Sequence, residues 1–272
     1  MMAAFLDPEL VTIALCWRLE RRDGIALGFT THDRDLAIGG LLYRAAPGML
    51  PSAISLGDGF DAEALDVMGA LSSAAISAAD LGAGRWDGAA LFVFMVDWED
   101  PGGDILAVAR GELGEVAIEG DGFEAELRGP AALLDAPVVE QTSPECRAAL
   151  GDRRCRVDMA PRTRLTRVEA VVAEDVLEVG DAAAGNAYGG GTLRWIGGAN
   201  SGLASLILGS EDGRLTLAEP PPFAAAAGDL IEIREGCDKS LATCAARFGN
   251  AANFRGEPHL PGMDLLTRYP GA

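Results

Sequence analysis

The sequence predicts a mainly β protein with a minor helical part. Apolar segments of strand length recur along the chain, and few of them are long enough for a stable helix. Turns that contain glycine, proline or Asp-Gly pairs separate these segments, as in antiparallel hairpins. Hydrophobic residues make up 49% of the 272 residues, so the chain is able to bury a substantial core.

The first half is expected to form a β meander with one short helix. The predicted strands cover residues 11–20, 25–31, 41–43, 90–98, 105–112, 115–119 and 123–128. The Asp23-Gly24 pair between the first two strands is a strong hairpin signal. A helix is predicted at residues 71–81, with Ser72 or Ser73 as its N-cap and Gly82 at its end.

The second half is expected to form a small barrel or sandwich between two short helices. Two prolines in residues 130–143 place a domain boundary after residue 135, which gives domains 1–135 and 136–272. Helices are predicted at residues 144–150, where Pro144 suits the first turn, and at residues 239–248. Strands are predicted at residues 165–173, 176–179, 191–196, 204–208, 215–217 and 230–234. Their spacing indicates an inserted β-barrel at about residues 165–235.

The charge of the chain is strongly acidic. It has 22 basic and 41 acidic residues, a net charge of −19 at pH 7. Such a surface repels phosphate backbones and no run of lysine or arginine offsets it, so sequence-specific binding of DNA or RNA is not expected.

An apolar stretch near the amino terminus, residues 10–17, follows Asp7 and Glu9 and precedes Arg18. It lacks the basic region of a signal peptide and is too short to span a bilayer. We therefore expect no membrane insertion and a cytoplasmic protein whose thiols stay reduced, which disfavours disulfides.

Four cysteines in two pairs are the main candidate site residues. Eight residues separate Cys146 from Cys155, six separate Cys237 from Cys244, and about eighty lie between the pairs. Four thiolates are typical of an iron–sulfur cluster or a structural zinc ion. Four unrelated buried cysteines remain an alternative, because neither gap has the short spacing of a zinc knuckle. Cys16, the fifth cysteine, alternates with other small residues in a strand pattern and is expected in the core.

Local sequence favours a shared site for the pairs. Cys237 is expected at or just before the start of the last helix, and Cys244 lies seven positions later, on the same helical face. Basic residues gather near both pairs, and we interpret them as counter-charges for thiolates: Arg147, Arg153, Arg154, Arg156, Lys239 and Arg247. His259 is a further candidate ligand, although a surface or packing role is favoured.

Two segments around the cysteines resemble a known family. The segments PECRAALGDRRC and CDKSLATCAARFGNAANFRGEPHLPG are similar to the tail-tip hub family of siphophages, which the tail-tip protein of lambda-like phages typifies. The similarity is strongest to the branch in alphaproteobacterial prophages and gene transfer agents. In the first half, GFTTHDRDL, SAAISAADLGAGRWDGA and the VDW at residues 96–98 are also similar to that branch.

The resemblance implies a fold, a cofactor and a role. It implies an N-terminal domain of the tail-tube or baseplate-hub type and a [4Fe–4S] cluster held by Cys146, Cys155, Cys237 and Cys244 in the C-terminal domain. It also implies a structural hub, located in a virion or tail particle and assembled in the cytoplasm of a bacterial host. The expected partners are copies of the chain itself, as a trimer, the distal tail protein ring and a central tip or fibre-like protein. DNA is expected only as cargo passing through the channel. Lambda-like members are shorter between the pairs, so the barrel is an insertion relative to them.

Two other functions compete with the hub. A zinc-stabilised interaction module would use the same four ligands. An iron–sulfur enzyme is the other alternative, but an enzyme is not expected, because no phosphate-binding loop, dinucleotide fingerprint, nucleophile elbow or zinc-protease motif is present. His32 with Asp33 and Asp35 is interpreted as a turn, in which aspartate side chains bind backbone amides.

Overall fold

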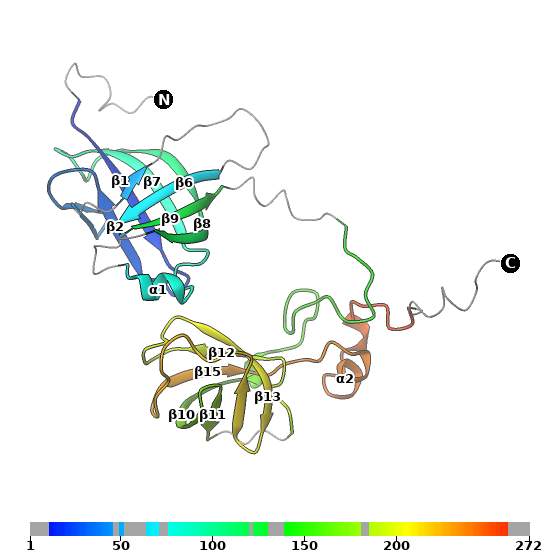
Figure 1. The fold of residues 1–272 in the computed structure, drawn as a ribbon. Helices are drawn as coiled ribbons and strands as arrows, with labels where there is room; N and C mark the ends of the chain where they lie inside the picture. Colours follow the sequence, from blue (N-terminus) through cyan, green and yellow to red (C-terminus); the bar gives the residue numbers. More distant parts are fainter. Residues whose placement is uncertain are drawn as a thin grey trace. The chain divides into compact units, whose positions relative to one another are not determined.

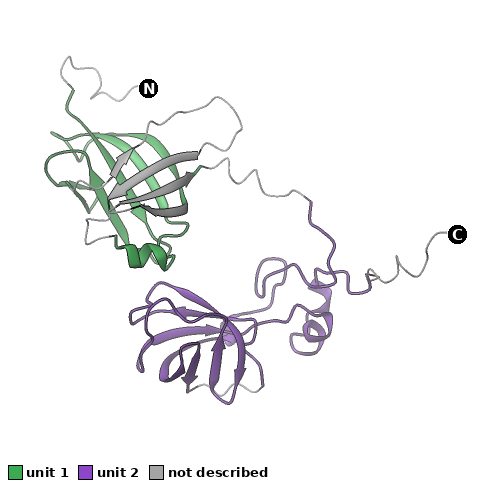
Figure 2. Ribbon diagram, in the orientation of Figure 1, with its two compact units in different colours: residues 1–138 green, residues 139–272 purple. Residues whose placement is uncertain are grey.

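The computed structural model describes residues 11–45, 49–51, 64–70, 76–119, 122–129, 139–180 and 185–260. The chain divides into two compact units, Met1–Val138 and Val139–Ala272 (Figure 2). The boundary predicted from the sequence lies after residue 135. Each unit is described by itself below.

In its described part, the first unit contains one nine-stranded sheet and a short helix (Figure 1). Its elements are β1 (Ile13–Glu20), β2 (Ala26–Thr30), β3 (Leu36–Ile38), β4 (Leu41–Arg44), β5 (Met49–Pro51), β6 (Ala64–Ala70), α1 (Ala78–Gly82), β7 (Ala90–Asp97), β8 (Ile105–Glu119) and β9 (Gly122–Arg128). The strand order is β3-β4-β2-β1-β7-β8-β9-β6-β5. Neighbouring strands are antiparallel, except for the parallel pair of β2 and β4.

The central strands of this sheet are covered on both faces. Trp17 and Leu91 belong to one buried cluster, together with Trp86 and with Leu81 of α1. Cys16 and Phe94, their neighbours along the strands, belong to a second buried cluster. Because both faces of β1 and β7 are buried, apolar residues follow one another without the alternation typical of a half-exposed strand. This explains the continuous apolar run at residues 91–96.

Some predicted elements of the first unit differ from the structure. Residues 105–112 and 115–119 form one strand, β8, whose pairing with β9 is irregular between Leu113 and Val116. The strands β3, β5 and β6 were not predicted. The N-cap of α1 is Ser77, whose hydroxyl accepts a bond from the Asp80 backbone N–H at 3.1 Å, so the predicted caps are wrong. Ser72 and Ser73 lie outside the described residues.

The second unit contains the predicted β-barrel. Its strands are β10 (Thr163–Ala173), β11 (Val176–Val179), β12 (Thr192–Trp195), β13 (Ala204–Glu211), β14 (Arg214–Leu217) and β15 (Leu230–Arg234). Among the residues described, they close in the order β10-β11-β14-β13-β12-β15, and β15 pairs back onto β10. Alternate residues point inward and fill the barrel; Leu177, Leu193, Ile207, Ile231 and Ile233 have no exposed surface. The mainly β fold class and the barrel are thus confirmed.

Short helical elements flank the barrel: η3 (Ala160–Arg162), α2 (Leu241–Ala246) and η4 (Ala251–Asn253). Ser240 caps α2 by accepting a bond from the Thr243 backbone N–H at 3.1 Å. None of the helices in the described residues is long and apolar enough to cross a membrane.

The helix predicted at residues 144–150 is wrong. This segment is irregular, because its backbone N–H groups bond to other segments and to a side chain. Cys146 donates to the Lys239 carbonyl at 2.9 Å, and Ala149 donates to the Asp152 carboxylate at 3.0 Å. Such contacts replace the bonds that a helix would need.

Candidate functional site

The four predicted ligand residues line one small cavity in the second unit. Cys146 and Cys155 come from the irregular segment before η3, Cys237 follows β15, and Cys244 lies on α2. Figure 1 shows these segments beside the barrel. The rest of the lining includes the apolar side chains Ala148, Leu150, Val157 and Phe248. The structure therefore brings together residues that are distant in the sequence.

Backbone hydrogen bonds join the segments that carry the two pairs. The Cys146 N–H donates to the Lys239 carbonyl at 2.9 Å, and the Arg147 N–H donates to the Arg255 carbonyl at 3.1 Å. The Glu257 N–H donates to the Ser143 carbonyl at 2.8 Å. These backbone bonds hold the segment that carries Cys146 against the segments that follow Cys237 and Cys244.

Three of the sulfur atoms accept hydrogen bonds from nitrogen. The backbone N–H of Lys239 donates to Cys237 Sγ at 3.4 Å, and that of Arg255 donates to Cys146 Sγ at 3.4 Å. The side-chain amide of Asn250 donates to Cys155 Sγ at 3.7 Å. Such N–H donors stabilise thiolates and the sulfur atoms of bound clusters. Neither Asn250 nor Arg255 was predicted from the sequence.

Turns with unusual backbone geometry shape the cysteine loops. Lys239 and Arg156 have positive backbone φ angles of 63° and 64°, which residues other than glycine rarely adopt. Cys237 lies before the Ser240 cap, outside α2, so helical spacing does not place it beside Cys244. The Lys239 turn does so instead, and the argument from a shared helical face is wrong.

The fourth cysteine is surrounded by the other three. Burial raises the pKa of Cys244, and the neighbouring thiols of Cys146, Cys237 and Cys155 raise it further. All four thiols line the same small cavity. Four thiolates would repel one another here, and a cationic centre would reverse that repulsion.

The side chains are not closed around a single ion. In the described part of the chain, no group of three or more His, Cys, Asp or Glu residues is arranged to hold a metal ion. Zinc would draw each sulfur to about 2.3 Å from one point. The donor chemistry, four soft thiols with N–H donors behind three of them, fits a thiolate-bound centre.

Comparison with known proteins assigns the family. A family model described as the N-terminal attachment domain of a baseplate hub protein matches residues 1–158, and a conserved phage protein family, BR0599, matches residues 186–264. A chain in a solved structure of the virion of a native gene transfer agent particle is 37% identical. That match covers 98% of this chain and 94% of the other, with a TM-score of 0.86. The chain belongs to the phage baseplate hub family. No curated protein matches it.

Membership of this family confirms the resemblance seen in the sequence. The hub protein is a structural component of a phage-like tail or gene transfer agent particle, and it assembles there with other tail proteins.

Three basic residues near the cysteines of the hub protein, Arg147, Arg154 and Lys239, bind carboxylates or carbonyls. Arg147 forms a bidentate salt bridge with Glu257, with N–O distances of 2.6 and 2.9 Å, and Arg154 forms a salt bridge with Glu140. The Lys239 ammonium donates to the Ala148 carbonyl at 2.6 Å. These contacts fix loops, so the interpretation of these cations as counter-charges for thiolates is not supported.

A polar junction connects the cysteine segments of the hub protein to its barrel. Glu235, which follows β15, accepts bonds from Arg162 and Arg247, each at 2.6 Å. Both guanidinium groups also contact the ring of Phe248, at 4.8 and 4.9 Å from its centre. The two ends of the barrel and the end of α2 are thereby tied together.

Neither histidine of the hub protein lines the cavity. His259 is exposed and is not among the cavity residues. His32 accepts a bond from the Arg34 backbone N–H at 3.1 Å, and its ring centre lies 5.0 Å from that of Trp98. This local bond fits the interpretation of residues 32–35 as a turn.

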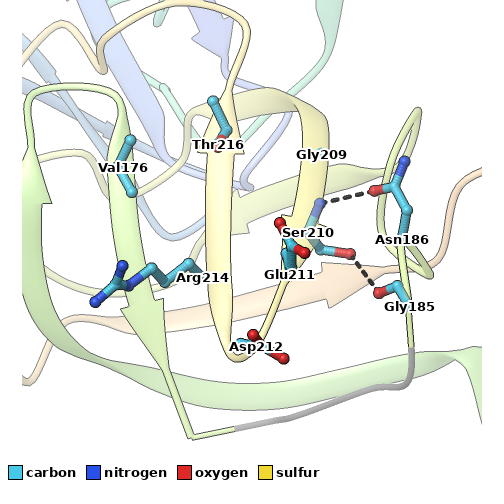
Figure 3. Close-up of a pocket in the computed structure, with 9 residues that line it drawn as sticks. All are labelled: Val176, Gly185, Asn186, Gly209, Ser210, Glu211, Asp212, Arg214 and Thr216. Carbon is cyan, nitrogen blue, oxygen red and sulfur yellow. Dashed lines mark hydrogen bonds between the residues drawn. The ribbon is translucent and has the colours of Figure 1, made fainter.

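Another cavity of the hub protein lies on the barrel, beside the β13–β14 hairpin (Figure 3). Asn186 accepts a bond from the Ser210 backbone N–H at 2.7 Å, and the Ser210 hydroxyl donates to the Gly185 carbonyl at 3.5 Å. The charged side chains of Glu211, Asp212 and Arg214 stand at its open rim. The bonds of Ser210 join the loop at residues 185–186 to β13, so we interpret this part of the cavity as structural.

Proposed function

We propose that this hub protein joins the tail tube and the distal tail ring to the central tip protein, as a trimer around the DNA channel. The observation that carries this proposal is the similarity of nearly the whole chain to a chain of a gene transfer agent virion, at a TM-score of 0.86. A mostly β protein with two units suits such a junction, because each unit offers a separate surface to a different ring. Closed rotational symmetry would require each copy to contact its neighbours in the same way.

The acidic charge supports the channel role. With a net charge of −19, the protein repels a phosphate backbone, so DNA passes without being held. In an assembled particle, we expect the residues that face the channel to be neutral or acidic. A basic channel lining would contradict this part of the proposal.

We further propose that Cys146, Cys155, Cys237 and Cys244 hold a [4Fe–4S] cluster with a structural role. The support is the convergence of the four thiols on one cavity and the N–H donors at three sulfurs. When bound, the cluster would supply a rigid crosslink between the segments before and after the barrel. In the chain-entropy model, closing a loop of this size stabilises a fold by about 4 kcal/mol. Zinc in the same site is the alternative.

Metal analysis and absorption spectroscopy test the site. Anaerobically purified protein is expected to be brown, to absorb broadly in the visible range and to contain iron and acid-labile sulfide. Cys244→Ser should abolish the colour and destabilise the second unit, whereas the matched control Cys16→Ser should keep it. A colourless protein with stoichiometric zinc would favour the zinc module, and a Cys244→Ser variant that stays brown would refute the ligand set.

Electron microscopy of assembled particles tests the hub role. We expect three copies at the tip, between the last tube or distal tail ring and the central tip protein. In cells that lack this protein, tails should have no tip, and wild-type protein supplied in trans should restore it. Normal tips without the protein, or a location elsewhere in the particle, would refute the proposal.

A further inference from the structure

Asn250 connects the two cysteine pairs. Its backbone N–H donates to the Cys244 carbonyl at 2.9 Å, which ties it to the end of α2. Its side-chain amide nitrogen donates to the Cys155 carbonyl at 2.6 Å, across 95 residues of sequence. One residue therefore holds a cysteine of the second pair through its backbone and a cysteine of the first pair through its side chain.

The same amide nitrogen also faces the sulfur. It lies 3.7 Å from Cys155 Sγ, within hydrogen-bonding distance of a sulfur atom. A primary amide carries two hydrogens on its nitrogen, so it is able to donate to the carbonyl and to the sulfur at once. The sulfur bond would strengthen when Cys155 carries a negative charge, because hydrogen bonds to ions are stronger than neutral ones.

The orientation of this amide is determined by its partners. The Cys155 carbonyl is only an acceptor, so the Asn250 atom beside it is the nitrogen. On the other side, Asn253 Nδ2 donates to Asn250 Oδ1 at 2.7 Å. The carbonyl of Cys155 assigns the nitrogen, and the bond from Asn253 is consistent with that assignment.

The Asn250 side chain does not cap the helix that it precedes. It stands at the N-cap position of η4, where an asparagine often binds the following backbone N–H groups, but its side chain makes no capping bond there. The amide is directed at Cys155 instead. A residue placed only to begin η4 would use its side chain for the cap.

We propose that Asn250 is a positioning residue of the four-cysteine site, which locks the Cys155 segment onto α2 and donates a hydrogen bond to the Cys155 sulfur when a metal centre is bound. Asn253 orients it. This inference rests on the metal site proposed above. It assigns to the NAANF segment a role that ligand spacing alone does not reveal.

The experiment compares Asn250→Asp and Asn250→Ala with wild type, using Asn253→Ala as the matched control, all in the full chain. Asn250→Asp preserves shape but replaces the donor with an anion, and Asn253→Ala keeps the donor while removing its support. The first measurement is the midpoint potential of the visible chromophore. Hydrogen bonds to cluster sulfurs raise this potential because they stabilise the reduced state. We expect a negative shift in Asn250→Ala, a larger one in Asn250→Asp and the smallest in Asn253→Ala.

The second measurement is the rate at which a ferrous chelator bleaches the chromophore. Loss of a residue behind a metal ligand typically weakens metal binding 10- to 100-fold, so Asn250→Ala should bleach about 10- to 100-fold faster than wild type. The bleaching rate of Asn253→Ala should exceed that of wild type by a smaller factor. Equal potentials and equal bleaching rates in all four proteins would overturn the proposal, even if the Asn250 variants melt at lower temperatures.

The metal content of wild type separates this inference from the proposed cluster. If wild type contains zinc, the cluster assignment fails, and release of zinc to a chelator should still be about 10- to 100-fold faster in Asn250→Ala. If wild type contains no metal, the melting temperature decides: the link between the pairs predicts a lower value for Asn250→Ala than for Asn253→Ala. Equal release rates, or equal melting temperatures in the metal-free case, would refute the role of Asn250.

Discussion

At the scale of single residues, the cysteines occupy two different environments. The four cysteines of the second unit line one small cavity in which N–H groups donate to three of the sulfurs, whereas Cys16 lies in the sheet of the first unit with no exposed surface. Its thiol donates to the Thr30 hydroxyl at 3.5 Å. Burial raises the pKa of the Cys16 thiol, and the bond to Thr30 lowers it by less.

Cys16 should therefore be inert in the folded protein. The reactive form of a thiol is the thiolate, and burial suppresses both its formation and its access. After treatment with N-ethylmaleimide at pH 7, peptide mass spectrometry should find Cys16 unmodified in native protein and modified in urea. Cys16→Ala should lower the free energy of unfolding by about 1 kcal/mol. Rapid labelling of the native protein would show that the first unit opens at this strand.

A second prediction concerns the pair of Arg147 and Glu257, which holds the chain after η4 against the first cysteine segment. The bonds from Arg147 and from the Ser143 backbone N–H lower the pKa of Glu257 from 4.5 to about 2. The folded protein binds this proton less tightly than the unfolded chain. The pair therefore stabilises the fold above pH 4.5, and this contribution is lost as the pH falls from 4.5 toward 2.

Thermal unfolding of wild type and Glu257→Gln checks this pH dependence. Above pH 4.5, the variant should melt at a lower temperature than wild type, and the difference should shrink as the pH falls toward 2. Both side chains are partly exposed, so high salt should also reduce the difference. A difference in melting temperature that is the same at every pH would show that the charge of Glu257 does not stabilise the fold.

At the scale of elements, glycines allow the cysteine segment to approach the barrel. A methyl group at Gly236 would overlap the Gly189 carbonyl oxygen and the Gly191 amide nitrogen. The backbone just before Cys237 therefore packs directly on the backbone of residues 189–191. No side chain fits between them.

Gly236→Ala should separate these two backbones. We expect a loss of about 1–3 kcal/mol of stability in the second unit, the usual cost of overpacking a tight contact, together with faster loss of any bound metal. Gly82→Ala is the matched control, because a methyl group there meets no atom within 4 Å. Denaturant unfolding of both variants measures the difference; equal stability would mean that the loop at residues 189–191 adjusts freely.

The bounds of a strand could be predicted from the sequence where a local pattern of residues determines them. The strands β11 and β15 have the predicted bounds, because alternating apolar residues lie between clear turn signals. The four cysteines of the cavity were also predicted as one group, because thiols share one metal-binding chemistry. The predicted helix before Cys155 is wrong, since the Ala149 N–H bonds to the Asp152 side chain in place of a helical carbonyl, and the first turn is held by the carbonyls of distant segments. Asn250 and Arg255 could not be found from the sequence for the same reason: their bonds to sulfur cross 95 and 109 residues.

At the scale of the whole molecule, the two units have separate cores. Trp17, Trp86 and Leu91 are buried in the first, and the inward residues of the closed barrel fill the second. The chain divides between Val138 and Val139, so each core belongs to one continuous stretch of sequence. The cavity of four cysteines lies entirely in the second stretch.

Residues 139–272 should therefore fold without the first unit. Expressed alone, this fragment should unfold cooperatively and retain the metal content and colour of the full protein, because a domain with its own core folds independently. Circular dichroism, metal analysis and calorimetry check this, and the fragment should melt with one of the transitions of the full chain. An unfolded fragment would show that the second unit depends on the first.

The sequence by itself determined the mainly β class, the barrel, the two pairs of cysteines and the hub family, because these depend on local periodicity, turn chemistry and residue type. Tertiary structure alone decided how the pairs meet. Irregular backbone, positive φ angles at Lys239 and Arg156, and the amide of Asn250 bring the four sulfurs to one cavity. The physical reason is that hydrogen bonds between distant segments outweigh the weak preference of a short segment for a helix.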